Sequence, residues 1–193
     1  MLANRGDHMF VVVNAACKDA DIARIKATLE PEITVTPITD RALVAVQGPA
    51  AGAAVASLDA AADGMRFMDF GTLTLDGVEV WASRSGYTGE DGFEISVPEA
   101  QAEAVVRRLL EIEGVEPIGL GARDSLRLEA GLCLYGNDID AGTNPVEASL
   151  TWAIQKARRA GGERAGGYPG ADVIQAAFDD GVGRKRVGLA PEG

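Results

Sequence analysis

The sequence predicts an α+β fold in which antiparallel or mixed sheets carry helices on one face. Short runs of alternating apolar and polar residues end in glycine-rich turns, the pattern of half-buried strands. Longer segments repeat apolar residues at helical spacing and start or stop at aspartate or proline. These segments follow the order strand, helix, strand, strand, helix, strand, which is typical of split β-α-β packing.

The first fifty residues contain three expected strands and one helix. The strands are expected over residues 9–14, 33–36 and 42–47. Asp19 or Asp21 can cap a helix that stops at Pro31. The apolar residues that share one face of this helix are Ile22, Ile25 and Leu29.

The middle and end of the chain continue the pattern. Pro49 opens an alanine-rich helix that runs through Val55 and Leu58. Asp76-Gly77 is a two-residue hairpin signal between strands 73–75 and 78–80. A helix is expected to begin at Pro98-Glu99. Its residues that face a core are Ala102, Val105, Val106 and Leu109. After Trp152, a glycine-rich connector over 161–170 leads to a short helix through Val173, Ile174 and Phe178.

Length and composition are those of a globular protein without metal or membrane chemistry. The 193 residues leave room for one or two domains, with 47% apolar and 24% charged residues. No apolar run reaches the roughly 18 residues of a membrane span. Cys17 and Cys133 lack the spacing of a metal site and the density of a disulfide scaffold, so reduced thiols are expected. The single histidine, His8, argues against zinc chemistry or a Ser-His-Asp triad.

The ends of the chain suggest a compartment and a partner. The first eight residues are too short and polar for a signal peptide, so a cytoplasmic setting is expected. The net charge of −11 makes nucleic acid an unfavourable partner. Between residues 152 and 186, however, basic residues outnumber acidic ones: Lys156, Arg158, Arg159, Arg164, Arg184, Lys185 and Arg186. This basic end either steers an acidic protein partner or is simply a solvated surface.

Two segments carry the strongest functional signal. The segment GYTGEDGFEI (residues 86–95) makes a tight glycine turn and then a strand, which puts Glu94 on the face opposite Phe93 and Ile95. The segment GLGARDSLRLEAG (residues 119–131) predicts a short helix with Arg123 in its first turn, where the helix dipole disfavours a cation. Together they suggest a buried carboxylate and a guanidinium that converge on one small polar ligand. The alternative is an exposed strand face and an ordinary ion pair.

Other motifs have simpler interpretations. Residues 119–124 begin like a dinucleotide fingerprint, but Asp124 replaces its third glycine and would repel a pyrophosphate. Asp138 and Asp140 do not supply the spaced series of oxygen ligands that a calcium-binding loop needs. Asp124 and Arg127 are spaced as a structural ion pair on one helix face.

The two long segments are similar to signature segments of the T-protein of the glycine cleavage system, a tetrahydrofolate-dependent aminomethyltransferase. The resemblance continues through further motifs and covers nearly the whole chain: LCLYGNDID (132–140), NPVE (144–147), SLTW (149–152) and GRKRVGL (183–189). It implies a T-protein-like folate-binding core of three parts. Residues 1–37 belong to a first folate-binding domain, 38–118 to a ferredoxin-like α+β domain, and 119–193 return to the folate site and lead on toward a C-terminal β domain.

The resemblance also assigns residues. Glu94 matches the family's pterin-binding glutamate, whose carboxylate accepts two adjacent N–H donors of the pyrimidine edge. Asn14 is similar to the asparagine at the strand end that lines the folate site. The further folate-site positions that match are Tyr87, Arg123, Tyr135 and Trp152, whose aromatic and guanidinium groups suit a flat pterin. No metal ligand is implied.

The implied reaction is transfer of a methylene group from the aminomethyl-lipoyl arm of the H-protein to tetrahydrofolate, with release of ammonia. In the family the catalytic aspartate lies in an Asp-Asp segment upstream of the position of Met1, and Asp7 does not match it. We therefore expect no catalytic residue, and little activity, in this chain alone. The alternatives are a non-catalytic folate-binding or regulatory relative, and the folate domain of a dimethylglycine- or sarcosine-oxidising enzyme. The oligomeric state stays open.

Overall fold

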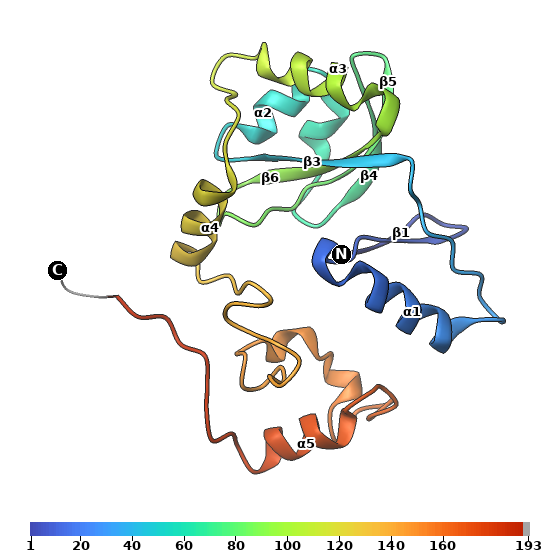
Figure 1. The fold of residues 1–193 in the computed structure, drawn as a ribbon, viewed down its shortest axis with the longest axis vertical. Helices are drawn as coiled ribbons and strands as arrows, with labels where there is room; N and C mark the ends of the chain where they lie inside the picture. Colours follow the sequence, from blue (N-terminus) through green and yellow to red (C-terminus); the bar gives the residue numbers. More distant parts are fainter. Residues whose placement is uncertain (191–193) are drawn as a thin grey trace. The chain divides into compact units, whose positions relative to one another are not determined.

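A computed structural model describes residues 1–190 of the chain. The chain folds as two compact units, one over Met1–Leu126 and one beginning at Arg127, and each is described by itself. The expected α+β class is confirmed (Figure 1). The division at residues 37 and 118 stays a prediction. Among the described residues, no helix combines the length and the apolar character needed to cross a bilayer.

The first unit contains six strands and four α-helices. In chain order these elements are β1 (Leu2–Asn4), β2 (Met9–Val11), α1 (Lys18–Leu29), β3 (Arg41–Gln47), α2 (Ala51–Ala56), β4 (Phe70–Leu75), β5 (Val78–Ser83), β6 (Gly92–Pro98), α3 (Glu99–Leu110) and α4 (Leu120–Glu129). Helix α4 continues past the boundary between the units. Two short 3₁₀ helices, η1 (Ala15–Cys17) and η2 (Ala60–Gly64), connect longer elements.

The main sheet is antiparallel, with the strand order β3-β6-β5-β4. Strand β6 pairs with β3 along its length and with the end of β5. The predicted hairpin between β4 and β5 is confirmed: Asp76 and Gly77 have φ angles of 50° and 78°, the left-handed values that a two-residue turn of this kind requires. This order places β6 inside the sheet, so its side chains have neighbours on both sides.

One face of the sheet packs against helices and forms the core. Phe93, Ile95 and Val97 of β6 are fully buried there. Helices α2 and α3 lie over this face (Figure 1), and α3 contributes Val105 and Leu109. Burial of such apolar groups contributes about 25 cal/mol per Å² removed from water. The opposite face of β6 carries Glu94 and is available for polar contacts.

The N-terminal segment differs from its prediction in two places. The strand expected over 9–14 ends at Val11, and it pairs with β1, a strand the sequence analysis did not predict. Residues 33–36 form no strand. Pro31 and Pro37 flank that run and cannot donate to a ladder, and Ile33 is 57% exposed, so no burial offsets the loss. The helix expected to end before Pro31 is confirmed as α1, but the expected cap is wrong: the helix begins after Cys17, and Asp19 and Asp21 lie within its first turn.

The second unit consists mostly of turns. Its regular elements are η3 (Thr151–Ala153), η4 (Lys156–Arg158) and α5 (Ala171–Asp179), and α5 confirms the short helix predicted after the glycine-rich connector. Few apolar residues are buried here: Ala148, Ile174 and Ala177. Polar contacts must therefore fix much of this backbone.

Candidate functional site

Glu94 occupies the predicted position on the sheet. Its neighbours across the ladders are Ala45 of β3 and Ser83 of β5. The carboxylate is half-buried, whereas Ser83 and Ser96 on the same face are almost fully buried. The alternation of β6 thus separates an apolar core face from a polar face. Glu94 lies on an inner strand, so backbone pairing on both sides fixes the position from which its side chain projects.

A pair of buried serines connects to this carboxylate. The hydroxyl oxygens of Ser83 and Ser85 are 2.9 Å apart, and Ser85 Oγ donates to Glu94 Oε2 at 3.5 Å, the long end of the hydrogen-bond range. Within residues 1–190 the carboxylate makes no ion pair. An ionised carboxylate has about four acceptor positions. Glu94 can therefore accept further N–H donors from a ligand.

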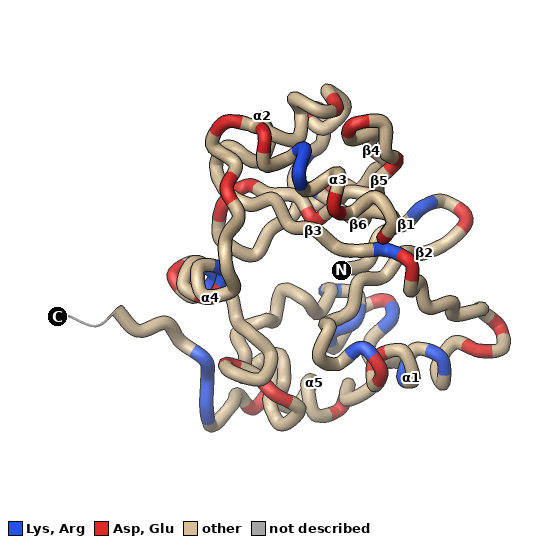
Figure 2. The backbone as a smooth tube through the Cα atoms, turned by 45° about the horizontal axis from the view of Figure 1, so that its top comes forward, with Lys and Arg blue, Asp and Glu red and all other residues tan. Residues whose placement is uncertain are grey.

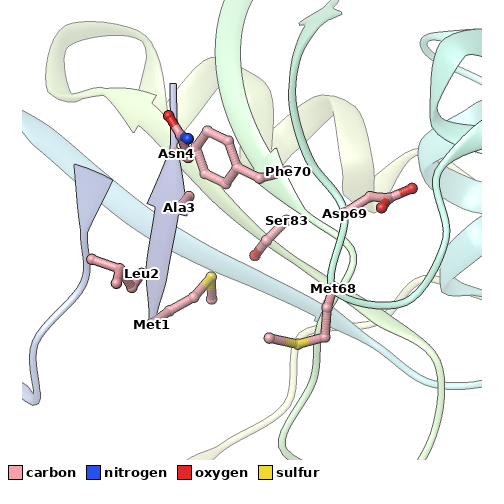
Figure 3. A pocket seen from close by; sticks show the side chains of 8 residues that line it. All are labelled: Met1, Leu2, Ala3, Asn4, Met68, Asp69, Phe70 and Ser83. Carbon is pink, nitrogen blue, oxygen red and sulfur yellow. The ribbon is translucent and has the colours of Figure 1, made fainter. Parts of the chain in front are cut away.

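A pocket adjoins Ser83, one member of this serine pair. It has a volume of about 240 Å³ and its lining includes Ser83, Phe70, Met68 and Asp69 (Figure 3). The remaining lining residues come from the N-terminal segment: Met1, Leu2, Ala3 and Asn4. Strand β1, absent from the sequence prediction, thus forms one wall. The serine pair links this pocket to Glu94.

The β1–β2 hairpin packs on the polar face of the sheet beside the pocket. Phe10 of β2 contacts the ring of Trp81 edge-on, with centroids 5.2 Å apart. The guanidinium groups of Arg5 and Arg41 lie 4.2 and 3.9 Å from the Trp81 centroid, close enough for cation–π attraction. Arg41 also donates to Ser96 Oγ and Ser96 O, at 2.9 and 2.6 Å. These contacts cover the polar face around Trp81 and Ser96.

The glycine turn brings two predicted site residues together. The guanidinium carbon of Arg123, the fourth residue of α4, lies 5.0 Å from the centre of the Tyr87 ring. Tyr87 is half-buried and Arg123 is exposed, so the planar pair borders solvent. The turn itself is braced by Arg84, which forms a bidentate ion pair with Asp91 at 3.0 and 2.7 Å. Hydrogen bonding to Arg84 holds the pKa of Asp91 below its ordinary value.

Asn14 has a local structural contact. Its side-chain oxygen accepts from Ala16 N at 3.1 Å and caps η1, just after β2. The residue is exposed. The cap fixes the direction in which the amide points, which suits a ligand contact but does not establish one. Its place in a folate site stays a prediction.

Tyr135 and Trp152 belong to the second unit. Tyr135 forms an isolated bridge with Ile139 and is 46% exposed, and Trp152 lies in η3 and is 78% exposed. Both rings offer open surface for stacking. Their assignment to a folate site also stays a prediction. No three His, Cys, Asp or Glu side chains gather as a metal site in the part of the chain that the structure describes.

Arginines fix the turns of the second unit. Arg127, 4% exposed, pairs with Asp138 and donates to Leu132 O at 3.1 Å, a buried role that the sequence analysis missed. Hydrogen bonding from the Leu134 amide, and then from Arg127, holds the pKa of Asp138 below its ordinary value.

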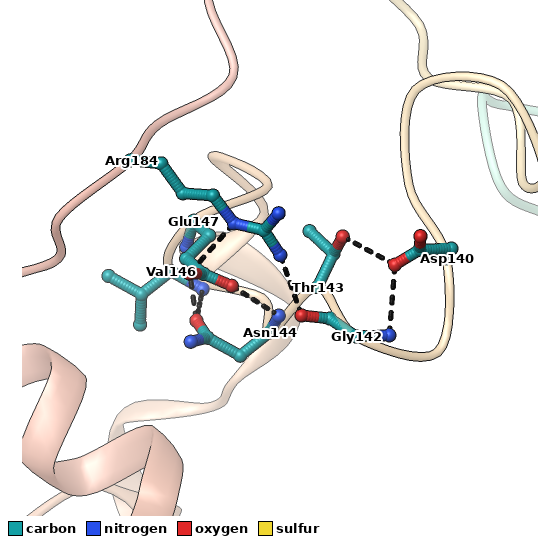
Figure 4. Close-up of polar contacts among 7 residues, drawn as sticks. All are labelled: Asp140, Gly142, Thr143, Asn144, Val146, Glu147 and Arg184. Carbon is teal, nitrogen blue, oxygen red and sulfur yellow. Dashed lines mark hydrogen bonds and ion pairs between the residues drawn. The ribbon is translucent and has the colours of Figure 1, made fainter.

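A second cluster surrounds Glu147 (Figure 4). Its carboxylate accepts from Arg184 Nε at 3.1 Å and from Asn144 N at 3.0 Å, and Arg184 Nη2 donates to Gly142 O at 2.7 Å.

Much of the basic end is used inside the unit. Figure 2 shows the run 184–186 as a continuous blue segment. Besides Arg184, three arginines donate to backbone carbonyls: Arg158, Arg159 and Arg186. Arg159 also lies 4.9 Å from the centre of the Phe178 ring. These four arginines stabilise the second unit. Attraction of an acidic partner, as expected of the basic end, would therefore depend on the remaining basic residues, Lys156, Arg164 and Lys185.

The fold and site define a class: an α+β protein whose antiparallel sheet is covered by helices on one face and carries a half-buried carboxylate on the other. The comparisons narrow this class. The family described as GCVT N-terminal domain matches residues 1–158, so the chain belongs to that family, the family of the glycine cleavage T-proteins.

The relatives of the chain agree with this membership. It is 44% identical over 210 residues to a mitochondrial aminomethyltransferase of Dictyostelium discoideum, covering 100% of this chain and 51% of the relative. It is 47% identical over 196 residues to that of Flaveria anomala, covering 97% and 47%. The crystal structure of glycine cleavage system aminomethyltransferase T from Bartonella henselae matches with a TM-score of 0.83 at 40% identity, covering 93% of this chain and 48% of that one. The chain spans about half the length of these relatives.

One expectation is corrected by these relatives. The cytoplasmic setting is wrong by this comparison, because the proteins of Dictyostelium and Flaveria are named mitochondrial. The expectation rested on the polar character of the first eight residues. Those residues describe the point where this sequence begins, and they carry no information about a compartment.

Proposed function

We propose that this chain is the folate-binding core of an aminomethyltransferase of the glycine cleavage system and that it binds tetrahydrofolate at Glu94. The observation that carries the proposal is the Glu94 carboxylate, which projects from an inner strand on the polar sheet face with acceptor positions to spare. The pterin presents adjacent N–H donors, which a fixed carboxylate can accept together. The Tyr87–Arg123 pair supplies flat surfaces near the same turn.

The reaction proposed for the whole protein uses this site to position one reactant. A tetrahydrofolate nitrogen attacks the aminomethyl carbon carried on the lipoyl sulfur of the H-protein. The carbon's bonds to nitrogen and to sulfur break, two bonds to folate nitrogens form, and ammonia and the reduced lipoyl thiol leave. No oxidant is consumed. Holding the reactants in a productive geometry is the main contribution expected of the residues described above.

The acidic H-protein would meet the part of the basic end that is not used internally. Within residues 1–190, Lys156, Arg164 and Lys185 are exposed and their side chains make no hydrogen bond or ion pair. Replacing all three with glutamine should slow association with the H-protein at low salt and flatten its salt dependence near about 0.15 M. Arg184→Gln serves as the contrast, because it should lower stability through loss of the Glu147 pair. Equal association rates of wild type and triple variant would exclude this docking role.

Calorimetric titration with tetrahydrofolate tests the core of the proposal. Saturable binding with one site is expected, and absence of heat or competition at millimolar ligand would overturn it. An activity assay of the chain in its full-length context, with aminomethylated H-protein as donor, then separates the transferase from the two alternatives. A folate-binding relative or the folate domain of a dimethylglycine- or sarcosine-oxidising enzyme would bind the ligand but release no ammonia from that donor.

A further inference from the structure

Gln47 stands at the junction of the elements that carry the candidate site. It is the last residue of β3 and lies opposite Gly92 in the β3–β6 ladder, two residues along from the pair Ala45–Glu94. Because side chains alternate along a strand, Gln47 is on the same face as Glu94. It is half-buried, and the sequence analysis did not select it.

The amide of Gln47 binds three points of the glycine turn. Gln47 Nε2 donates to Ser85 O at 3.2 Å and to Phe93 O at 3.3 Å. Gln47 Oε1 accepts from Tyr87 N at 3.0 Å. One side chain thus holds the residue before Glu94, the backbone of Tyr87, and the serine that donates to Glu94.

The glycines of the turn make room for this amide. A Cβ built on Gly86 or on Gly92 would lie within 3.0 Å of the Gln47 side-chain amide, closer than real Cβ atoms come. Neither glycine has a φ in the left-handed region, so the backbone alone does not demand glycine at these two positions. Gly89 differs from these two glycines, because its φ of 82° is a left-handed backbone conformation that favours glycine. A Cβ at Gly86 or Gly92 would therefore displace the Gln47 amide, and at Gly86 it would also lie 3.3 Å from the backbone oxygen of Glu90.

We propose that Gln47 is a positioning residue of the folate site: it fixes the 85–93 turn so that Tyr87 and Glu94 are ordered before the ligand binds. The inference rests on the proposed function. Without the amide, ordering of this turn would take place on binding and would weaken the affinity for tetrahydrofolate by about tenfold. The hydrogen bonds of the Gln47 amide are made to the turn, so its effect passes through Tyr87 and Glu94.

The test compares Gln47→Ala with a matched variant, Asp59→Ala. Asp59 also ties side chain to backbone in the first unit, accepting from Ala61 N at 2.9 Å and Thr74 N at 2.7 Å, and it has no contact with the turn. Both variants should lower the melting temperature. Only Gln47→Ala should raise the Kd for tetrahydrofolate, measured by calorimetry well below the melting temperature of each variant.

Gly92→Ala provides a second, independent perturbation. Its Cβ should displace the Gln47 amide and raise the Kd by a similar factor, and the double variant Gln47→Ala/Gly92→Ala should be no worse than either single one, because both act on one contact. Unchanged affinity in folded Gln47→Ala and Gly92→Ala, with wild type binding normally, would overturn the positioning role and leave the proposed function intact. Absence of binding by wild type would overturn both.

Discussion

The carboxylate of Glu94 can be tested by one substitution that keeps its size. Glu94→Gln removes the charge and turns one acceptor into an N–H₂ donor. In the structure the side chain is half-buried and receives one long hydrogen bond, from Ser85 at 3.5 Å, so little inside the protein depends on its charge. The folding stability should therefore change by less than about 1 kcal/mol.

The effect on binding should be much larger. A pterin edge with two N–H donors would lose one charge-assisted bond to repulsion between donors, and the other would become a neutral bond. Hydrogen bonds to charged groups contribute about 1.5–3 kcal/mol, which corresponds to about ten- to a hundredfold in Kd. Because Glu94 is partly open to solvent, the lower half of that range is expected.

Calorimetric titration with tetrahydrofolate measures the change directly. Glu79→Gln is the matched control, because Glu79 is an exposed carboxylate on the same face of the neighbouring strand β5. It should leave the Kd unchanged. If Glu94→Gln bound tetrahydrofolate within about twofold of wild type, the carboxylate would not be the pterin ligand, and the assignment of the polar sheet face as the site would be refuted.

Three further perturbations test other parts of the structure. Arg123→Lys keeps the charge but loses the flat guanidinium beside Tyr87, so the Kd for tetrahydrofolate should rise about two- to fivefold in calorimetry. Arg127→Met leaves Asp138 without its buried partner and should lower the free energy of unfolding by about 2–4 kcal/mol in urea titration. Arg84 lowers the pKa of Asp91 in the folded state below the ordinary value of 3.8. The ionised Asp91 should therefore stabilise the fold at pH values above 3.8, and this stabilisation should be lost as the pH falls below 3.8. Asp91→Asn should flatten that part of the plot of unfolding free energy against pH.

Each of these has an outcome that contradicts it. An unchanged Kd in Arg123→Lys would remove the guanidinium plane from the binding surface. A loss below about 0.5 kcal/mol in Arg127→Met would mean that the pair with Asp138 gives little net stability. A stability profile of Asp91→Asn that kept the wild-type slope as the pH fell below 3.8 would assign the acid sensitivity to other carboxylates, with Asp138 the first to examine.

Local signals predicted the elements that local physics determines. The Asp76-Gly77 turn, the helix after Pro98 and the polar side of β6 each follow from a few neighbouring residues. The false strand at 33–36 came from β-branched residues whose propensity is not supported by burial. Strand β1 has three residues and exists through its pairing with β2, which no local pattern shows.

Candidate site residues could be selected where a motif coincides with an alternating strand, but not where residues distant in the sequence meet. Glu94 and Arg123 stand out in their own segments. Gln47 lies about forty residues before the turn that it holds. Ser83 is part of the site because it lies opposite Glu94 in the β5–β6 ladder. A polar residue that ends an apolar strand, as Gln47 ends β3, is a signal that could have directed attention to it. The buried role of Arg127 depends on Asp138, which comes from another turn.

The fit of the Gln47 amide against two glycines has a consequence for how this sequence can vary. Gly92 makes room for the Gln47 side chain alone, so a shorter residue at position 47 would free it to accept alanine, whereas a Cβ at Gly86 would still lie 3.3 Å from Glu90 O. A longer residue at 86 or 92 would in turn select against glutamine at 47. In relatives that diverge from this sequence, positions 47 and 92 should change together, whereas Gly89 should remain glycine whatever residue ends β3.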